Sequence, residues 1–338
     1  MRILITRTDR IGDVMLSTPV IKALRDKYPD AHIAFCVKPE AVEIVDKNPY
    51  LNEVVVYDKR KKYRRIFGII RFIFKLRRKK FDLAIILHPT NRMNISCFLA
   101  GIPRRVGYNK KLGFLLTDKI PHTKEKGEKH ELEYALDVIR YIGVEGRDKR
   151  LYMSLHSDTE TKVKHVLEEN NIHRLSNLVV IAPGASCPSK RWPSEYFAEL
   201  IEGIHKKYGA KIIIVGDKFD TPTAKNITDI IDAKVVNLTG KTSLSVLAGI
   251  LSKARVFISN DSGPVHIAVS VATPVVVMFG RSDAGLSPKR WGPLGDRDIV
   301  LHKDVGCGKC LAHNCQRGFA CLKAIPISEV LDAASSFL

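Results

Sequence analysis

The chain has 338 residues, of which 45% are hydrophobic, and a formal net charge of +19. This length allows two ordinary domains, each with its own core, and no apolar stretch reaches the ~20 residues needed to span a bilayer. The first residues, MRILITRT, lack the long apolar centre of a signal peptide. We therefore expect a cytoplasmic protein.

Strand-like and helix-like segments alternate along the chain, which indicates parallel sheets with right-handed crossovers. In the first half the apolar runs predict strands at 2–5, 32–37, 54–57, 83–87 and 104–108. In the second half they predict strands at 178–181, 211–215, 235–238, 255–259 and 275–279. The predicted helices are 14–27, 132–142, 158–170, 194–208, 221–231, 243–251, 265–271 and 328–337. Two such series predict two doubly wound domains, 1–160 and 161–338.

The segment 59–80 holds twelve Lys and Arg and no acidic residue. Its apolar residues have the spacing of one helix face: Ile66, Ile69, Ile70, Ile73 and Phe74. We expect this face to pack on the protein's own sheet while the cationic rim meets anionic lipid or a phosphorylated acceptor. Nucleic-acid binding is the alternative, but no zinc-finger or RNA-binding signature accompanies the charge.

The first strand leads into a polar loop, Thr8 to Asp13, that precedes a helix. Gly12 permits close approach of a ligand. Asp13 is either an N-cap of the helix or a carboxylate held in a cleft as a general base. Asp9 is a weaker candidate base, and Arg10 could hold either carboxylate.

In the second half, three strands are followed by polar, glycine-containing loops. In APGASCPSKRWP, Lys190 could contact a phosphate as a point charge and Ser186 could donate to one; alternatively the loop is an ordinary basic loop anchored by Trp192. Asp220, four residues after Gly216, either accepts from a ribose hydroxyl or caps a helix. The third loop predicts Ser243 as an N-cap.

A fourth loop, in NDSGPVH at 260–266, combines glycine with the start of a small-residue helix. The N-terminus of such a helix suits an anion such as a diphosphate. His266 lies in the first turn, where it is either a structural residue or a ligand contact. Because these four loops follow parallel strands, we expect them to meet at one sheet edge.

Three of these segments together resemble glycosyltransferase family 9, the heptosyltransferases: RTDRIGDVMLSTP, PSKRWP at 188–193 and DSGPVH at 261–266. The resemblance implies a GT-B fold, in which two Rossmann-like domains face each other across a cleft. The N-terminal domain would bind the acceptor and the C-terminal domain the nucleotide sugar. It also implies an inverting glycosyltransferase that moves a heptose from ADP-heptose to the lipopolysaccharide inner core and requires no metal or other cofactor.

Residue by residue, the resemblance assigns the catalytic base to Asp13, with Arg10 and Gly12 on the acceptor side. The donor contacts that it implies are Ser186 and Lys190 at phosphate, Asp220 at ribose, Thr242 at adenine, and Asp261, Ser262, Gly263 and His266 at the diphosphate and sugar. The partners would be the nucleotide sugar and a lipid-linked anionic glycan, met at the inner face of the cytoplasmic membrane through segment 59–80, and no nucleic acid. A nucleotide-sugar epimerase or another nucleotide-sugar-dependent glycosyltransferase is the alternative.

Four cysteines cluster near the C-terminus: Cys307, Cys310, Cys315 and Cys321. Their spacing is compatible with a structural zinc or iron–sulfur site, with two disulfides, or with free thiols. A reducing cytoplasm disfavours disulfides.

Overall fold

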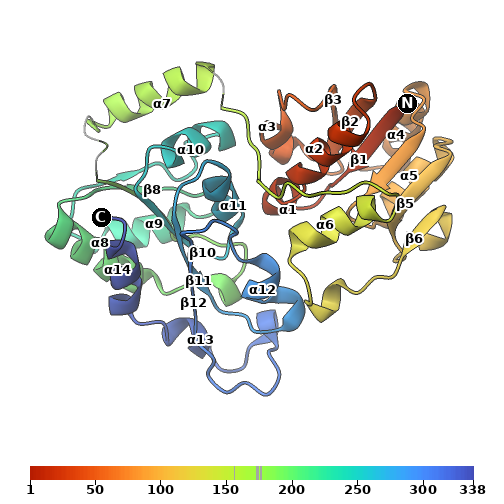
Figure 1. The fold of residues 1–338 in the computed structure, drawn as a ribbon. Coiled ribbons are helices and arrows are strands. Elements are labelled where there is room, and N and C mark those ends of the chain that lie inside the picture. The colour runs from red at the N-terminus through yellow and green to blue at the C-terminus, as the bar shows by residue number, and fades with distance from the viewer. Residues whose placement is uncertain (156, 173–174, 176) are drawn as a thin grey trace. The chain divides into compact units, whose positions relative to one another are not determined.

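The computed structural model describes all residues except 156, 173–174 and 176. It divides into two compact units, Met1–Ser154 and Leu155–Leu338. Each unit contains one six-stranded sheet, and among the described residues all neighbouring strands pair in parallel (Figure 1). The α/β fold class with two parallel-sheet domains is therefore confirmed.

The sheet of unit 1 has the strand order β3-β2-β1-β4-β5-β6. Its strands are β1 (Arg2–Thr6), β2 (His32–Val37), β3 (Glu53–Val56), β4 (Leu83–Ile86), β5 (Arg104–Tyr108) and β6 (Asp118–Ile120). Strand β1 lies between β2 and β4, with Ile3 opposite both Ile33 and Leu83. The chain winds outward from β1 to β3 and then returns to β4, so the carboxyl ends of β1 and β4 form a topological switch point.

Helices cover both faces of this sheet. They are α1 (Ile11–Met15), α2 (Thr18–Lys27), α3 (Val42–Val45), α4 (Ile66–Arg78), α5 (Asn91–Leu99) and α6 (Glu131–Arg140). Helices α4 and α5 pack on each other and share one core with the sheet, to which they contribute Phe72, Leu76, Met93 and Cys97. Helices α2 and α6 contact each other, and right-handed crossovers place them on the opposite face.

Unit 2 repeats the topology, with the order β12-β11-β10-β7-β8-β9. The strands are β7 (Leu178–Ala182), β8 (Lys211–Ile214), β9 (Val235–Asn237), β10 (Val256–Asn260), β11 (Val275–Phe279) and β12 (Ile299–His302). The first and fourth strands, β7 and β10, are again neighbours. The switch point of unit 2 therefore lies at their carboxyl ends.

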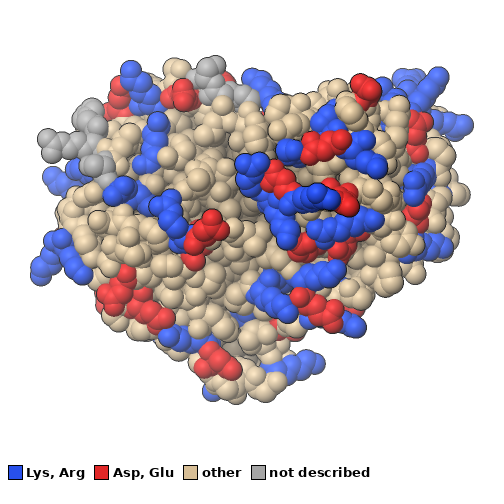
Figure 2. Space-filling model, in the orientation of Figure 1, with Lys and Arg blue, Asp and Glu red and all other residues tan. Residues whose placement is uncertain are grey.

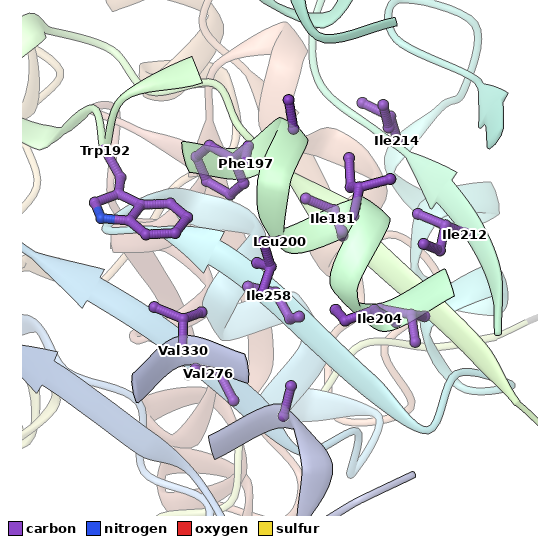
Figure 3. Packing of buried hydrophobic residues seen from close by; sticks show 14 of the residues in the cluster. Ile181, Trp192, Phe197, Leu200, Ile204, Ile212, Ile214, Ile258, Val276 and Val330 are labelled. Atoms are coloured by element: carbon purple, nitrogen blue, oxygen red, sulfur yellow. The ribbon is translucent and has the colours of Figure 1, made fainter. Parts of the chain in front are cut away.

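The helices of unit 2 are α7 (Ser157–Glu169), α8 (Ser194–Tyr208), α9 (Thr221–Thr228), α10 (Leu244–Leu251), α11 (Gly263–Ser270), α12 (Pro288–Trp291), α13 (Ala320–Lys323) and α14 (Ile327–Ser335). One buried cluster joins α8, α9 and α14 to the sheet. Figure 3 shows Trp192, Phe197 and Leu200 over Ile258 and Val276 of the central strands. These side chains are almost fully buried.

The prediction of one helix over 14–27 is wrong, because the chain breaks between α1 and α2. The Ser17 hydroxyl donates to the Asp13 carbonyl and the Thr18 hydroxyl to the Met15 carbonyl, each at 2.8 Å. Pro19 then starts the second helix without a backbone donor. Hydroxyls that bond to carbonyls one turn back compete with the helix ladder.

The expected packing of the basic helix is also wrong in part. Ile66, Ile70 and Phe74 are exposed rather than packed. Phe72 and Leu76 form the buried face of α4 instead. Helix α4 therefore has apolar side chains on two faces, and the spacing alone did not indicate which face meets the sheet.

Several regular elements were not predicted from the sequence: β6, β12, α5 and the four-residue helices α3, α12 and α13. The edge strands β6 and β12 are three and four residues long, and short edge strands lack the continuous apolar run of a buried strand. Helix α5 has weak apolar periodicity because polar Asn94 and Ser96 are buried in it. In the described part of the chain, no helix is long and apolar enough to cross a membrane.

Candidate functional site

Asp13 lies in the first turn of α1, directly after the switch-point strand β1. The N-cap residue is Arg10, three positions earlier, and no side chain caps this helix. The capping interpretation of Asp13 is therefore wrong. Its carboxylate is 7% exposed and accepts a hydrogen bond from the Arg7 guanidinium.

Arg7 is the centre of a buried ionic cluster in unit 1. Its Nε donates to Asp9 Oδ1 at 2.9 Å, and both Nη1 and Nη2 donate to Glu131 Oε1 at 3.0 Å. Lys124 Nζ also donates to Glu131 Oε1, at 2.7 Å, and lies 4.7 Å from the centroid of the Tyr108 ring. The cluster thus combines two cations with three carboxylates, counting Asp13.

This charge balance affects the proton affinity of Asp13. Burial and the neighbouring Asp9 carboxylate raise the pKa of Asp13 to about 6, although Arg7 acts in the opposite direction. A carboxylate with this pKa is ionised at neutral pH and still basic enough to accept a proton in a transition state. His88 Nδ1 lies 3.2 Å from Asp9 Oδ2, and burial lowers the pKa of this imidazole to about 4.

The cation that holds the carboxylates is Arg7 and not Arg10, which is exposed; that expectation for Arg10 is wrong. Gly12 is buried within α1, beside Asp13. Sequence reasoning missed Arg7, Glu131 and Lys124. Arg7 could have been found as a charge directly after a buried strand, whereas Glu131 is 124 positions away and no local pattern joins it to the loop.

In unit 2, Asp261 follows the switch-point strand β10 and is buried between two cations. Lys190 Nζ lies 2.9 Å from Asp261 Oδ2, and Arg281 Nη2 lies 2.6 Å from the same oxygen. All three residues are less than 9% exposed. Two cations around one carboxylate leave a net positive charge, as an anion site requires. Arg281 was not singled out in the sequence, because it follows β11 in a loop without a motif.

Ser262 is the N-cap residue of α11, with an extended backbone, but its side chain forms no capping bond. Its hydroxyl lies 3.0 Å from that of Ser259. Gly263 begins the helix, and His266 is buried in the first turn. Helix α11 thus begins two residues after Asp261, whose carboxylate contacts both cations.

Asp220 lies at the start of α9, yet its side chain forms no capping bond to that helix. Its Oδ2 accepts from the Asp217 backbone N–H at 3.0 Å. A Cβ atom on Gly184 would lie 2.0 Å from Asp220 Cγ, so the carboxylate occupies space that only glycine leaves open. Burial raises the pKa of Asp220. The loops after β7 and β8 therefore meet at this carboxylate.

Asn260 joins the loop after β7 to the end of β10. Its side chain accepts from the Trp192 backbone N–H at 2.9 Å and donates to the Pro183 carbonyl at 2.7 Å. Trp192 is buried, and its indole N–H donates to the Ile325 carbonyl at 3.1 Å. Trp192 is thus the packing anchor, while Lys190 in the same loop reaches Asp261.

In the described part of the chain, the remaining predicted donor residues form no hydrogen bond or ion pair with this cluster. Ser186 is exposed, with its hydroxyl 4.0 Å from Cys187 Sγ. Thr242 is half-buried in the loop before α10. The predicted N-cap at Ser243 is confirmed, because its hydroxyl accepts from the Val246 N–H at 3.3 Å.

The four C-terminal cysteines are free and partly buried, and they line a cavity of about 250 Å³ together with Ser189 and Arg281. Cys321 Sγ donates to the Gly280 carbonyl at 2.6 Å. Within the described residues, no three His, Cys, Asp or Glu side chains are arranged to hold a metal ion. Of the three expected alternatives, the arrangement of these four cysteines fits free thiols rather than a metal site or two disulfides.

Comparisons with known proteins agree on one family. The model of glycosyltransferase family 9 (heptosyltransferase) matches residues 69–320. Lipopolysaccharide heptosyltransferase 3 of Escherichia coli K12 is 25% identical over 335 residues, covering 97% of this chain and 95% of that protein. A family 9 glycosyltransferase structure from Veillonella parvula superposes with a TM-score of 0.88 at 23% identity, covering 99% and 96% of the two chains. The E. coli ADP-heptose LPS heptosyltransferase II structure gives 0.81 at 21% identity, covering 100% and 98%.

Proposed function

Because the chain belongs to glycosyltransferase family 9, the heptosyltransferases, we propose that it transfers a heptose from ADP-heptose to a sugar of the lipopolysaccharide inner core, with inversion and without a metal ion. The observation that carries the proposal is Asp13, a buried carboxylate with a pKa raised to about 6 at the switch point of unit 1. The names of the relatives support the donor and the acceptor: one is a lipopolysaccharide heptosyltransferase and another an ADP-heptose LPS heptosyltransferase.

In the proposed reaction, an acceptor hydroxyl oxygen attacks the anomeric carbon of the heptose. The bond from this carbon to the diphosphate oxygen breaks, and its electron pair leaves with ADP. Asp13 takes the hydroxyl proton as the new glycosidic bond forms. One in-line displacement inverts the anomeric configuration. Arg7 would hold the Asp13 carboxylate in place, while Gly12 and the exposed Arg10 would lie on the acceptor side.

Unit 2 is proposed to bind the donor and to stabilise the leaving diphosphate. Lys190 and Arg281 outnumber the single carboxylate of Asp261, and the N-terminus of α11 at Ser262 and Gly263 adds its positive dipole end. Fixed positive charge of this kind stabilises the growing negative charge of a leaving group. This supports a reaction in which protein cations, rather than a metal ion, stabilise the leaving diphosphate.

The other donor contacts are carried over from the family resemblance. Asp220, held over Gly184, would accept from ribose hydroxyls. Ser186 would donate to a phosphate, Thr242 would contact adenine, and His266 would face the sugar.

The proposed partners are the nucleotide sugar and a lipid-linked anionic glycan, met at the inner face of the cytoplasmic membrane. Family membership makes the chain a glycosyltransferase, which leaves the nucleotide-sugar epimerase without support. A basic membrane-binding or nucleic-acid-binding protein that uses this fold only as a scaffold would not account for the buried ionic clusters after β1 and β10.

The test combines donor binding and transfer. Thermal unfolding in the presence of ADP-, UDP- and GDP-sugars should show the largest stabilisation with ADP-heptose. Incubation with ADP-heptose and a delipidated inner-core oligosaccharide should give one new heptosyl linkage, with inverted configuration by NMR, in the presence of EDTA. A preference for UDP- or GDP-sugars contradicts the donor, and loss of transfer with EDTA contradicts metal independence.

A further inference from the structure

Helix α4 leaves one apolar face uncovered. Phe72 and Leu76 are buried against the sheet, whereas four large apolar side chains on the helix are exposed. Phe67 is 81% exposed and Phe74 is 56% exposed. Residues 67, 70 and 74 are spaced by three and four positions, so they share one face of the helix.

The uncovered face continues onto neighbouring elements. Helix α5 packs beside α4 on the same sheet face, and the short 3₁₀ turn Gly113–Leu115 packs beside α5. Phe98 of α5 is 46% exposed and Phe114 of the turn is 69% exposed. We define the α4–α5 surface as Ile66, Phe67, Ile70, Phe74, Phe98 and Phe114.

The chain around this surface is strongly cationic. Residues 59–117 contain seventeen Lys and Arg and a single acidic residue, Asp82. Asp82 is engaged elsewhere, because its carboxylate accepts from the Arg2 backbone N–H at 2.7 Å. Figure 2 shows Lys and Arg along the right-hand edge of unit 1, where Figure 1 places α4.

Several of these cations lie on α4 itself, among the exposed apolar side chains. Arg71, Arg77 and Arg78 are exposed. Among the described residues, none of these three arginines forms a salt bridge with a carboxylate. The Arg105 guanidinium lies 5.3 Å over the Phe98 ring. Aromatic side chains surrounded by arginines have the composition of an interfacial membrane element.

We propose that the α4–α5 surface docks on an anionic lipid bilayer, with Phe67 and Phe74 entering the boundary between headgroups and acyl chains and the surrounding arginines binding lipid phosphates. This proposal adds a membrane surface to the proposed function. It rests on that function only for the reason that the protein would dock, because a lipid-linked acceptor would be met at the membrane. It differs from a purely electrostatic attachment, because the exposed aromatic side chains add a contribution that salt does not screen.

Charge complementarity favours lipid over the other occupants. A second copy would place the same cation-rich segment against itself, and like charges across an interface oppose association. A nucleic acid would satisfy the arginines but would give Ile66 and Ile70 no apolar environment. An anionic bilayer provides both phosphate groups and hydrocarbon.

The experiment is flotation of the full-length protein with vesicles of phosphatidylcholine, with and without phosphatidylglycerol, at low and high salt. The unchanged protein should float with the anionic vesicles, and a fraction should stay bound at high salt. In the double variant Phe67→Ser, Phe74→Ser, we expect partitioning to fall by roughly tenfold or more and the salt-resistant fraction to disappear. Tyr141→Ser is the matched control, because this aromatic residue is 54% exposed at the end of α6, on the other sheet face.

A second measurement detects insertion without removing apolar area. The single variant Phe67→Trp should give a blue-shifted emission, relative to the unchanged protein, when anionic vesicles are added, and brominated acyl chains should quench it. Unchanged flotation of the double serine variant, or an emission of the Phe67→Trp variant that vesicles leave unaltered, overturns the proposal. A third outcome also overturns the proposal: the unchanged protein is a dimer and the serine variant a monomer in size-exclusion chromatography, and neither protein floats with the vesicles.

The outcome is separable from that of the proposed function. Flotation uses neither donor nor acceptor, and transfer can be measured with a delipidated acceptor and no vesicles. A protein that floats but transfers no heptose contradicts the proposed function alone. A protein that transfers heptose but floats equally well with and without the two phenylalanines contradicts the docking surface alone.

Discussion

Asp13 and its neighbours form a cluster in which negative charge exceeds positive charge by one. Arg7 and Lys124 face the carboxylates of Asp9, Asp13 and Glu131. One proton can therefore enter the cluster and neutralise it, and burial directs this proton to Asp13 by raising its pKa. At the scale of single residues, the proposed proton acceptor is therefore a carboxylate that one buried guanidinium holds in place.

Replacing the proposed base should separate binding from turnover. We expect Asp13→Asn to lower kcat by about 10²–10⁴-fold, because proton transfer by a positioned side chain contributes that much. The affinity for ADP, measured by calorimetry, should not change, since the proposed donor contacts lie in unit 2. Asp9→Asn serves for comparison and should retain more activity. Turnover near that of the unchanged protein in Asp13→Asn would exclude this carboxylate as the base.

The same substitution should stabilise the fold at neutral and alkaline pH. The pKa of Asp13 is raised from 3.8 to about 6 in the folded state, so the ionised form is disfavoured by folding. This penalty is absent below the unfolded pKa and fully present above the folded pKa. In denaturant titrations at about pH 8, Asp13→Asn should therefore be more stable than the unchanged protein by about 1–3 kcal/mol, and this advantage should shrink towards pH 4. A variant that is less stable at alkaline pH would contradict the burial penalty.

Glu131 is proposed to position the base through Arg7. Its negative charge raises the pKa of Asp13, so Glu131→Gln should move the acidic limb of the kcat/KM profile to a lower pH and reduce the plateau rate. Glu133→Gln is the matched control on the same helix, because Glu133 pairs with Arg140 at 2.7 Å outside the cluster. An acidic limb at the same pH in both variants would show that Glu131 has only a structural role.

At the scale of elements, the site depends on loops that approach one another closely. The Asp220 carboxylate fills the space over Gly184, between the loops after β7 and β8. The contact links two consecutive strands of the sheet through a single side chain. It also explains why a glycine is needed in a loop whose backbone has no positive φ at that residue.

Gly184→Ala should displace Asp220 and weaken donor binding. The added Cβ would lie 2.0 Å from Asp220 Cγ, which forces the carboxylate or the loop to move. We expect the KM for the nucleotide sugar to rise by roughly tenfold with a smaller change in kcat. Gly203→Ala on α8 is the control, because its Cβ would meet Leu331 at an ordinary 3.4 Å. Equal KM values in the two variants would contradict the role of this contact.

The sequence predicted the strands that are buried on both faces. It missed elements whose structure depends on contacts with other parts of the fold. Strands β2 and β11 occur at the predicted bounds, because each is a continuous apolar run between turn residues. Edge strands β6 and β12 lack this pattern. The helix break at Ser17 depends on hydroxyl–carbonyl bonds, which composition does not reveal.

The candidate site shows the same division. Asp13, Lys190 and Asp261 follow strands, so their position could be predicted from the sequence. Of their partners, Arg7 could have been found directly after β1, whereas Glu131 and Arg281 could not, because the fold brings them in from other parts of the chain. Which face of α4 is buried also depends on the sheet beneath it rather than on the helix.

At the scale of the whole molecule, both units use the same plan. In each, the first strand lies beside the fourth, and the ionic clusters follow these strands: Asp13 after β1, and Asp261 after β10. Each unit also has its own buried core. Because each unit has its own core and its own proposed ligand, we expect the two units to unfold independently.

Calorimetry should resolve this independence. We expect two unfolding transitions. ADP at a hundred times its dissociation constant should stabilise the unit that unfolds in one of them by about 2.7 kcal/mol. Asp13→Asn should shift the midpoint of the other transition. A single transition that both changes shift together would show that the units unfold as one.

The amide of Asn260 has a consequence for the energetics of recognition. By bonding Trp192 and Pro183 at once, it holds both ends of the loop after β7 against the end of β10 before any ligand arrives. Little backbone entropy remains to be lost when a nucleotide enters. Exposed positions of this loop can therefore change without loosening the pocket, whereas a change at this one buried amide would release both ends of the loop together.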